Sequence, residues 1–231
     1  MRRLLVLVSC VAAAAGIIAV VAPEAGADMG TPSSVVIALH GGGWWAGDSE
    51  SVAFICAALE TPERACVAPD YTLSMVAPFP AANRDLARLT RGLREQGFER
   101  VYAVGVSSGG NLAAWLGAKG LVDGFVSWSA PSDLRRIDWW RRGPGWVVHR
   151  FAPTRRNRIN ASPALRQMSV PALIIHSQDE WIPLGHAQRL HDADPLSELT
   201  ILPGSAHGLQ AAPVALPLTV TWLDSLEAQD S

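Results

Sequence analysis

The strongest constraint on the fold is a regular alternation between short apolar runs and longer segments with helical periodicity. The apolar runs lack a polar residue at every second position, which is typical of strands that are buried on both faces. Strands of this kind that alternate with helices form a mostly parallel sheet. The expected strands are Ser34–Leu39, Ala65–Ala68, Val101–Val106, Val122–Ser127, Ala172–His176 and Glu198–Leu202.

The segments between these runs are predicted to be helices that flank the sheet. The clearest pattern has Leu86, Leu89 and Leu93 at helical spacing, with arginines on the other faces. A length of 231 residues with 49% hydrophobic residues suits one compact α/β domain with its own core. The expected helices are Ser49–Leu59, Ala82–Gln96, Ser108–Ala118, Leu184–Asp192 and Pro213–Ala228.

The alternation is interrupted in the segment 132–168, which is interpreted as a small cap insertion over the edge of the sheet. Eight arginines fall between Arg135 and Arg158 in this segment. They either pack along their stems with their charges in water, or form a basic rim for an anionic ester or an anionic envelope surface. The candidate substrate-binding residues of the cap are Trp139, Trp140 and Trp146.

The first 27 residues are expected to form a signal peptide, and residues 28–231 the mature domain. Two arginines follow Met1, the stretch Leu4–Ala22 is almost wholly apolar, and Ala25-Gly26-Ala27 offers a cleavage site. The mature protein is then expected to be secreted, or to reside in the periplasm or cell envelope. A retained membrane anchor is the alternative, because about 20 apolar residues can span a bilayer.

Charge and cysteine usage narrow the function further. A net charge of −2 gives no indication of a nucleic-acid partner, and no spacing of histidines or cysteines indicates a metal. We therefore expect no cofactor, and the oligomeric state stays open. In an oxidising compartment Cys56 and Cys66 form either a disulfide or two buried free thiols, since spacing alone does not decide between them.

One pentapeptide carries a specific chemical signal. The stretch Gly105-Val106-Ser107-Ser108-Gly109 matches G-x-S-x-G and falls between a predicted strand and a predicted helix. A glycine-rich turn is the alternative interpretation. In a nucleophile elbow this turn projects the serine hydroxyl out of the sheet, above the positive end of the following helix. Ser107 is therefore the candidate nucleophile.

A serine nucleophile needs a base and a carboxylate that orients the base. His207 stands in "PGSAHGL", in a loop after the last predicted strand, where it can reach the elbow. The carboxylate is assigned to Asp179 in "HSQDEWIP", with Glu180 as its rival and Asp133 as a third choice. Main-chain donors for an oxyanion are expected in "LHGGGWWAGD", which lacks the features of a phosphate-binding loop.

Taken in order, "HGGGW", "GVSSGGNLA", "DEWIP" and "GSAHG" resemble an α/β-hydrolase of the carboxylesterase type. The nearest groups are the hormone-sensitive-lipase-like and the acetyl-esterase or feruloyl-esterase-like enzymes. The resemblance runs from about Ser34 to the end of the chain. Two departures stand out: the elbow has "GVSSGG" in place of "GDSAGG", and the spacing from His176 to Asp179 is one residue short.

The resemblance implies a trimmed α/β-hydrolase sheet of about six strands and a role for each motif residue. It implies that His40 braces the oxyanion loop. The enzyme would be a serine esterase for small to medium carboxylic esters, of unspecified acyl and alcohol groups. An amide hydrolase with the same triad, or a non-catalytic binding protein on this fold, is the alternative. The implied residues are Ser107, Asp179 and His207 for catalysis, Gly42, Gly43 and Ser108 for the oxyanion, and Trp44 for substrate.

Overall fold

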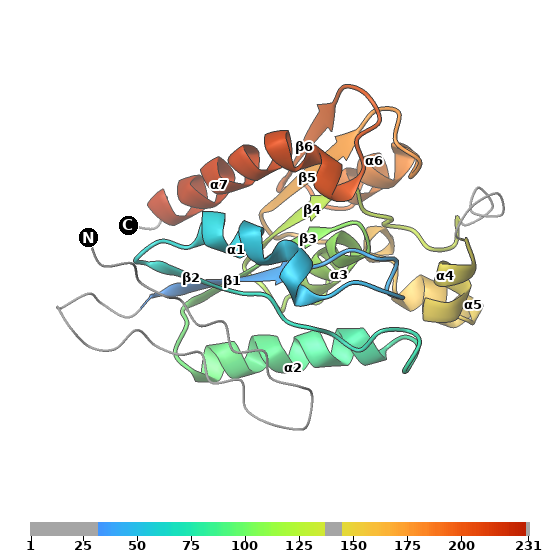
Figure 1. The fold of residues 1–231 in the computed structure, drawn as a ribbon, viewed down its shortest axis with the longest axis horizontal. Helices are drawn as coiled ribbons and strands as arrows, with labels where there is room; N and C mark the ends of the chain where they lie inside the picture. The colour runs from blue at the N-terminus through green and yellow to red at the C-terminus, as the bar shows by residue number, and fades with distance from the viewer. Residues whose placement is uncertain (1–31, 137–144, 230–231) are drawn as a thin grey trace.

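The computed structural model of the protein describes residues 32–136 and 145–229. Its strands are β1 (Ser34–Leu39), β2 (Arg64–Val67), β3 (Arg100–Val106), β4 (Gly124–Trp128), β5 (Ala172–Ser177) and β6 (Ser197–Leu202). They form one sheet in the order β2-β1-β3-β4-β5-β6, and every neighbouring pair is parallel (Figure 1). The predicted α/β fold with six strands is thereby confirmed.

Helices cover both faces of this sheet, as the apolar runs require. The helices are α1 (Ala53–Leu59), α2 (Ala81–Glu95), α3 (Ser108–Gly117), α4 (Gly145–Phe151), α5 (Arg155–Asn160), α6 (Gly185–Asp192) and α7 (Ala212–Ala228). Ile37 and Leu39 belong to a core cluster with apolar residues of α2, α3, α4 and α6. Val36 and Ala38 point to the other face and share a cluster with α1 and α7.

The parallel arrangement brings the carboxyl ends of all six strands to one edge of the sheet. The loops after β1, β3, β5 and β6 carry the glycine motif, the elbow, the acidic pair and His207. Ligands of open α/β sheets bind outside this edge. The fold therefore gathers all four motifs without any further rearrangement of the chain.

The segment interpreted as a cap contains α4 and α5, and its described residues contain no strand. Both helices lie beside the carboxyl edge of the sheet (Figure 1). Phe151 at the end of α4 is buried, and its carbonyl oxygen accepts a hydrogen bond from the Phe79 N–H at 2.6 Å. The candidate residues Trp139 and Trp140 lie outside the described residues.

Helix α7 is held against β1 and β2 by polar contacts, most of which a buried arginine makes. Arg64 of β2 is 0% exposed, and its guanidinium lies 2.8 Å from both Asp224 and Glu227 of α7. Ser34 of β1 also donates a hydrogen bond of 2.6 Å to Glu227. On the same side of the sheet, Cys56 of α1 and Cys66 of β2 form a disulfide, the first of the two alternatives left open above.

The predicted signal peptide lies outside the described residues and stays a prediction. Within residues 32–136 and 145–229, no helix has both the length and the apolar character needed to cross a bilayer.

Candidate active site

The two glycines around Ser107 are explained by the close packing of the turn between β3 and α3. Ser107 has φ 55° and ψ −116°, a conformation that non-glycine residues rarely adopt. A Cβ atom on Gly105 would lie 2.1 Å from the Gly109 carbonyl oxygen. A Cβ atom on Gly109 would lie 2.2 Å from the Leu39 carbonyl oxygen. Only glycine fits at both positions, so the pentapeptide forms the strained strand–turn–helix of a nucleophile elbow.

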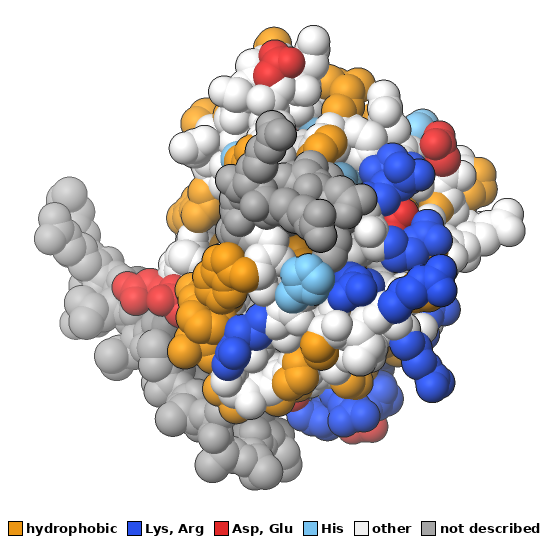
Figure 2. All heavy atoms as spheres, turned by 90° about the vertical axis from the view of Figure 1, so that its right-hand side faces the viewer, with side chains coloured by type: hydrophobic (Ala, Val, Ile, Leu, Met, Phe, Trp, Pro, Cys, Tyr) orange, Lys and Arg blue, Asp and Glu red, His pale blue; other side chains and the backbone are white. Residues whose placement is uncertain are grey.

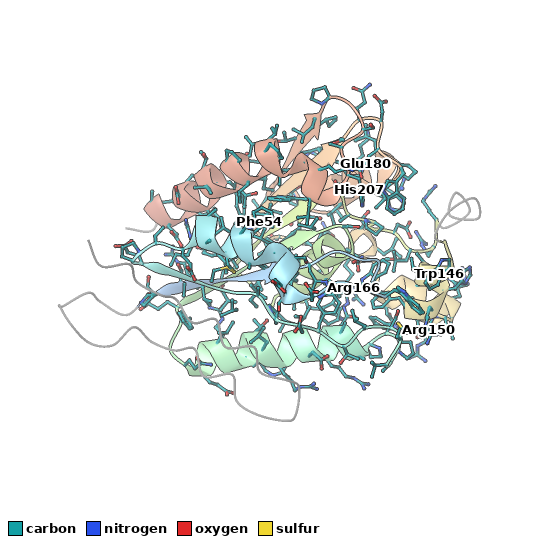
Figure 3. All side chains as sticks on the ribbon, viewed as in Figure 1. Phe54, Trp146, Arg150, Arg166, Glu180 and His207 are labelled. Atoms are coloured by element: carbon teal, nitrogen blue, oxygen red, sulfur yellow. A yellow bond between two sulfur atoms is a disulfide. The ribbon has the colours of Figure 1, made fainter. Side chains whose placement is uncertain are left out.

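The elbow brings Ser107 to His207, as the motif order predicts. Oγ of Ser107 lies 3.1 Å from Nε2 of His207. On the other side of the same ring, Nδ1 is in short contact with Oε2 of Glu180. Figure 3 shows Glu180 and His207 next to each other at the carboxyl edge of the sheet. A hydroxyl, an imidazole and a carboxylate are thus connected in series.

The assignment of the carboxylate has to be corrected from Asp179 to Glu180. Asp179 is exposed, and its N–H donates to the Gly204 carbonyl oxygen at 2.9 Å, whereas Nδ1 of His207 is paired with Glu180. The Glu180 carboxylate is fully buried. Asp133, the third choice, is buried against Arg135 instead. The spacing from His176 to Asp179 is one residue shorter than in the related esterases, and the spacing from His176 to Glu180 removes this difference. The sequence therefore already contained a signal that favoured Glu180.

Two serines that sequence analysis missed hold the loop around His207. Oγ of Ser177 donates to the Ala206 carbonyl oxygen at 2.6 Å, while the Ser177 N–H donates to Oε1 of Glu180 at 3.2 Å. Oγ of Ser129 accepts from the Gly208 N–H at 3.1 Å, and Ser129 itself has φ 52°. The residues on both sides of His207 are therefore fixed by side chains at the ends of neighbouring strands.

The glycine-rich loop after β1 lies directly against the elbow. A Cβ atom on Gly41 would be 3.4 Å from the Ser107 Cβ atom. Gly42 and Gly43 have φ +102° and +64°, which favour glycine. Ser108 follows the nucleophile and is the first residue of α3, where backbone N–H groups have no partner within the helix. The loop and the helix end can therefore offer main-chain donors beside the serine.

His40 and Tyr71 form a buried stack behind this loop. Their ring centroids are 4.2 Å apart with an interplanar angle of 8°. The Tyr71 hydroxyl donates to the His40 carbonyl oxygen at 3.0 Å, and Nδ1 of His40 lies 2.8 Å from the Gly41 carbonyl oxygen. Burial lowers the pKa of His40, which keeps the ring neutral, and raises the pKa of Tyr71. The pair supports the backbone of the loop from its inner side.

Trp44 is a core residue, whereas Trp146 and Trp181 are exposed. Trp44 was expected to contact substrate, but it is 0% exposed and stacks on Phe151 with centroids 4.4 Å apart, so it belongs to the core. Trp146 is 51% exposed and meets the edge of Trp45 at 4.5 Å. Sequence analysis missed Trp181, which is 45% exposed and lies 4.5 Å from the His207 ring.

Arginines gather on the face that carries α4 and α5. Figure 2 shows these basic side chains next to an apolar patch. Arg150 of α4 is placed over the Trp45 ring at 5.1 Å and donates to the Met75 carbonyl oxygen at 3.3 Å. Arg155 and Arg156 of α5 are exposed.

Among the described residues, no group of three or more His, Cys, Asp or Glu is placed to hold a metal ion.

Comparison with known proteins agrees with this geometry. Residues 36–131 match the model of a family described by the alpha/beta hydrolase fold. An esterase/lipase from an uncultured bacterium is 24% identical, with a TM-score of 0.72 over 85% of this chain and 77% of that one. An acetyl ester-xyloside bifunctional hydrolase from Caldicellulosiruptor lactoaceticus is 18% identical, with a TM-score of 0.73 over 88% and 86%.

A hyperthermophilic esterase from the archaeon Pyrobaculum calidifontis is 20% identical, with a TM-score of 0.71 over 86% of this chain and 78% of that one. A search of curated protein sequences gives no match. The sheet order, the elbow and these structural likenesses lead to the same conclusion: the chain has the α/β-hydrolase fold.

Proposed function

We propose that this protein is a serine carboxylesterase in which Ser107, His207 and Glu180 form the catalytic triad. The observation that carries the proposal is the continuous series from the Ser107 hydroxyl through both nitrogens of His207 to the buried Glu180 carboxylate. Several solved structures of similar fold are those of esterases or lipases, which supports an ester as the substrate.

The reaction follows from this arrangement in two half-reactions. Ser107 Oγ attacks the ester carbonyl while His207 Nε2 takes its proton, and His207 then gives this proton to the departing alcohol. A water molecule attacks the acyl-enzyme, gives a proton to His207 and releases the acid, and the proton returns to Ser107. Glu180 orients the ring and stabilises the imidazolium that forms in each step.

The developing oxyanion needs donors that are in place before the reaction begins. We assign this role to the backbone N–H groups of Gly42, Gly43 and Ser108. The assignment is supported by the close approach of the glycine loop to Ser107 and by the position of Ser108 at the start of α3. His40 and Tyr71 keep the loop in place, so the donors need not reorganise when charge develops.

The side chains near the site favour an apolar or aromatic ester of small to medium size. Trp181 covers one side of His207, and the exposed Trp146 lies against Trp45 on the cap side. The exposed Arg155 and Arg156 of α5 support an anionic ester as substrate or an anionic envelope surface as partner. Export to an oxidising compartment is also proposed, and the Cys56–Cys66 disulfide supports it.

The proposal is tested with p-nitrophenyl esters of increasing acyl length and with matched anilides. We expect ester turnover that Ser107→Ala lowers by about 10⁴-fold or more while the protein stays folded. A serine-reactive phosphonate should label the native protein and fail to label Ser107→Ala. Faster turnover of the anilides than of the esters would indicate an amide hydrolase instead of an esterase. Absence of both turnover and labelling would indicate a non-catalytic binding protein.

A further inference from the structure

A second histidine, which the proposed mechanism does not use, lies on the inner side of Glu180. His176 is near the end of β5 and is 1% exposed. Its Nδ1 atom lies 3.2 Å from Oε1 of Glu180, while Oε2 of the same carboxyl group contacts His207. The carboxyl group of Glu180 is therefore placed between two imidazole rings.

The partner of Nε2 determines where one hydrogen of the His176 ring lies. Nε2 is 2.9 Å from the Ile182 carbonyl oxygen, and a carbonyl only accepts, so Nε2 carries a hydrogen. In a neutral ring with this tautomer, Nδ1 presents a lone pair. This lone pair would face a buried carboxylate oxygen at 3.2 Å, and two acceptors at that distance repel each other in a medium of low dielectric constant.

The titratable groups that face His176 come from three elements. Glu180 follows β5, His207 follows β6, and His186 belongs to α6. Burial is the largest influence and lowers the pKa of His176, whereas Glu180 and the Ile182 carbonyl raise it and His207 lowers it. A proton that is shared between His176 and Glu180 leaves this buried pair without net charge, which is the state that burial favours.

We infer that Nδ1 of His176 and Oε1 of Glu180 share one proton at neutral pH, and that His176 is thereby a positioning residue for the acid of the triad. The inference rests on the proposed function, because it takes Glu180 as the acid. The shared proton stays with the pair throughout acyl transfer, and only the proton between Ser107, His207 and the leaving group moves. The pair presents less negative charge to His207 than a free carboxylate would.

Removing the shared proton should therefore strengthen the attraction between Glu180 and the charged form of His207. The carboxylate would then carry its full charge, and an opposite charge nearby favours the imidazolium form. Protonated His207 cannot take the proton of Ser107, so activity is lost on the acid side. The acidic limb of kcat/KM should consequently move to higher pH by about 1 unit.

Two substitutions separate the charge of His176 from its shape. His176→Asn keeps an N–H donor near the position of Nδ1 without a titratable proton, whereas His176→Phe keeps only the ring shape. Both should move the acidic limb upward, and His176→Asn should keep kcat at the plateau within about threefold of the native enzyme. His186→Asn is the matched control, because His186 is a buried histidine that accepts from the Ser132 and Asp133 N–H groups instead.

An unchanged acidic limb in folded His176→Asn and His176→Phe would overturn the inference. A measurement that needs no substrate decides the case even if the esterase proposal fails. The native enzyme labelled with ¹⁵N-histidine should show the Nδ1 resonance of His176 shifted toward the protonated form at pH 7. A resonance of an unprotonated nitrogen that accepts no hydrogen bond would contradict the shared proton.

Discussion

Oγ of Ser177 donates a hydrogen bond of 2.6 Å to the Ala206 carbonyl oxygen and so joins the loop that carries Glu180 to the loop that carries His207. The Ser177 N–H also donates to the carboxyl group of Glu180. One residue at the end of β5 thus contacts both the acid and the backbone beside His207. Ser177 therefore helps to hold Glu180 and His207 in their relative positions.

Ser177→Ala should lower kcat about tenfold with little change in KM, because it leaves the Ala206 carbonyl without its donor and loosens the position of His207. Unfolding by urea should show a loss of about 1 kcal/mol in stability. Ser205→Ala is the control, since Ser205 is exposed in the same loop. Equal effects of the two substitutions on kcat would contradict the role given to Ser177.

Glu180→Gln should reduce kcat by about 10³- to 10⁴-fold, because the amide cannot stabilise the imidazolium of His207 and can hold the ring in the wrong tautomer. Asp179→Asn should leave kcat within about threefold, since its side chain is exposed. Steady-state kinetics on one short-chain ester compares the pair directly. A larger loss for Asp179→Asn would restore the assignment made from sequence.

Acid should destabilise the protein through His186. Burial is the main cause that lowers its pKa from 6.5 to about 3, with Arg189 adding to the effect. The unfolded chain therefore binds a proton that the folded protein does not bind between these two pH values. The free energy of unfolding should fall by about 1.4 kcal/mol for each pH unit as pH decreases through this window.

The measurement is a series of urea titrations across that window, with His186→Asn for comparison. Asparagine can still accept from the Ser132 and Asp133 N–H groups but cannot be protonated. The variant should show a shallower dependence on pH. A slope as steep as that of the native protein would assign the acid sensitivity to other groups.

If the arginines of α5 attract an anionic ester, kcat/KM for that ester should fall as salt rises, because exposed charges are screened over about 8 Å at physiological ionic strength. A neutral ester of equal length serves as the internal reference. Replacing Arg155 and Arg156 by Gln should reduce the salt dependence, whereas Arg91→Gln on α2 should not. Identical salt responses of the two esters would indicate that these arginines are only solvated.

The sequence predicted the sheet because buried parallel strands are continuous apolar runs that need no long-range information to recognise. Ser107 and His207 were predicted because the elbow and the order of motifs are constrained by mechanics. The carboxylate that contacts His207 was assigned wrongly, since Asp179 and Glu180 are adjacent and only their spacing from His176 favoured Glu180. The residue types are chemically equivalent, so spacing was the signal that should have decided between them.

Trp44 illustrates a second limit. Its sequence position directly after Gly42 and Gly43 suggested a contact with substrate, but the burial of Trp44 depends on which cap residues pack against it. Phe151 of α4 stacks on its ring, and this contact joins parts of the chain that are far apart in sequence. The serines at the ends of β4 and β5 were missed for the same reason, because their partners follow β6.

The fastening of α7 to Arg64 and Ser34 has a consequence for the order in which the chain matures. Arg64 and Ser34 are made well before their partners Asp224 and Glu227, which lie 160 or more residues further along the chain. Until α7 is made, the guanidinium of Arg64 has no carboxylate partner there and remains in water. The β1–β2 side of the sheet therefore acquires these contacts only after α7 has been made.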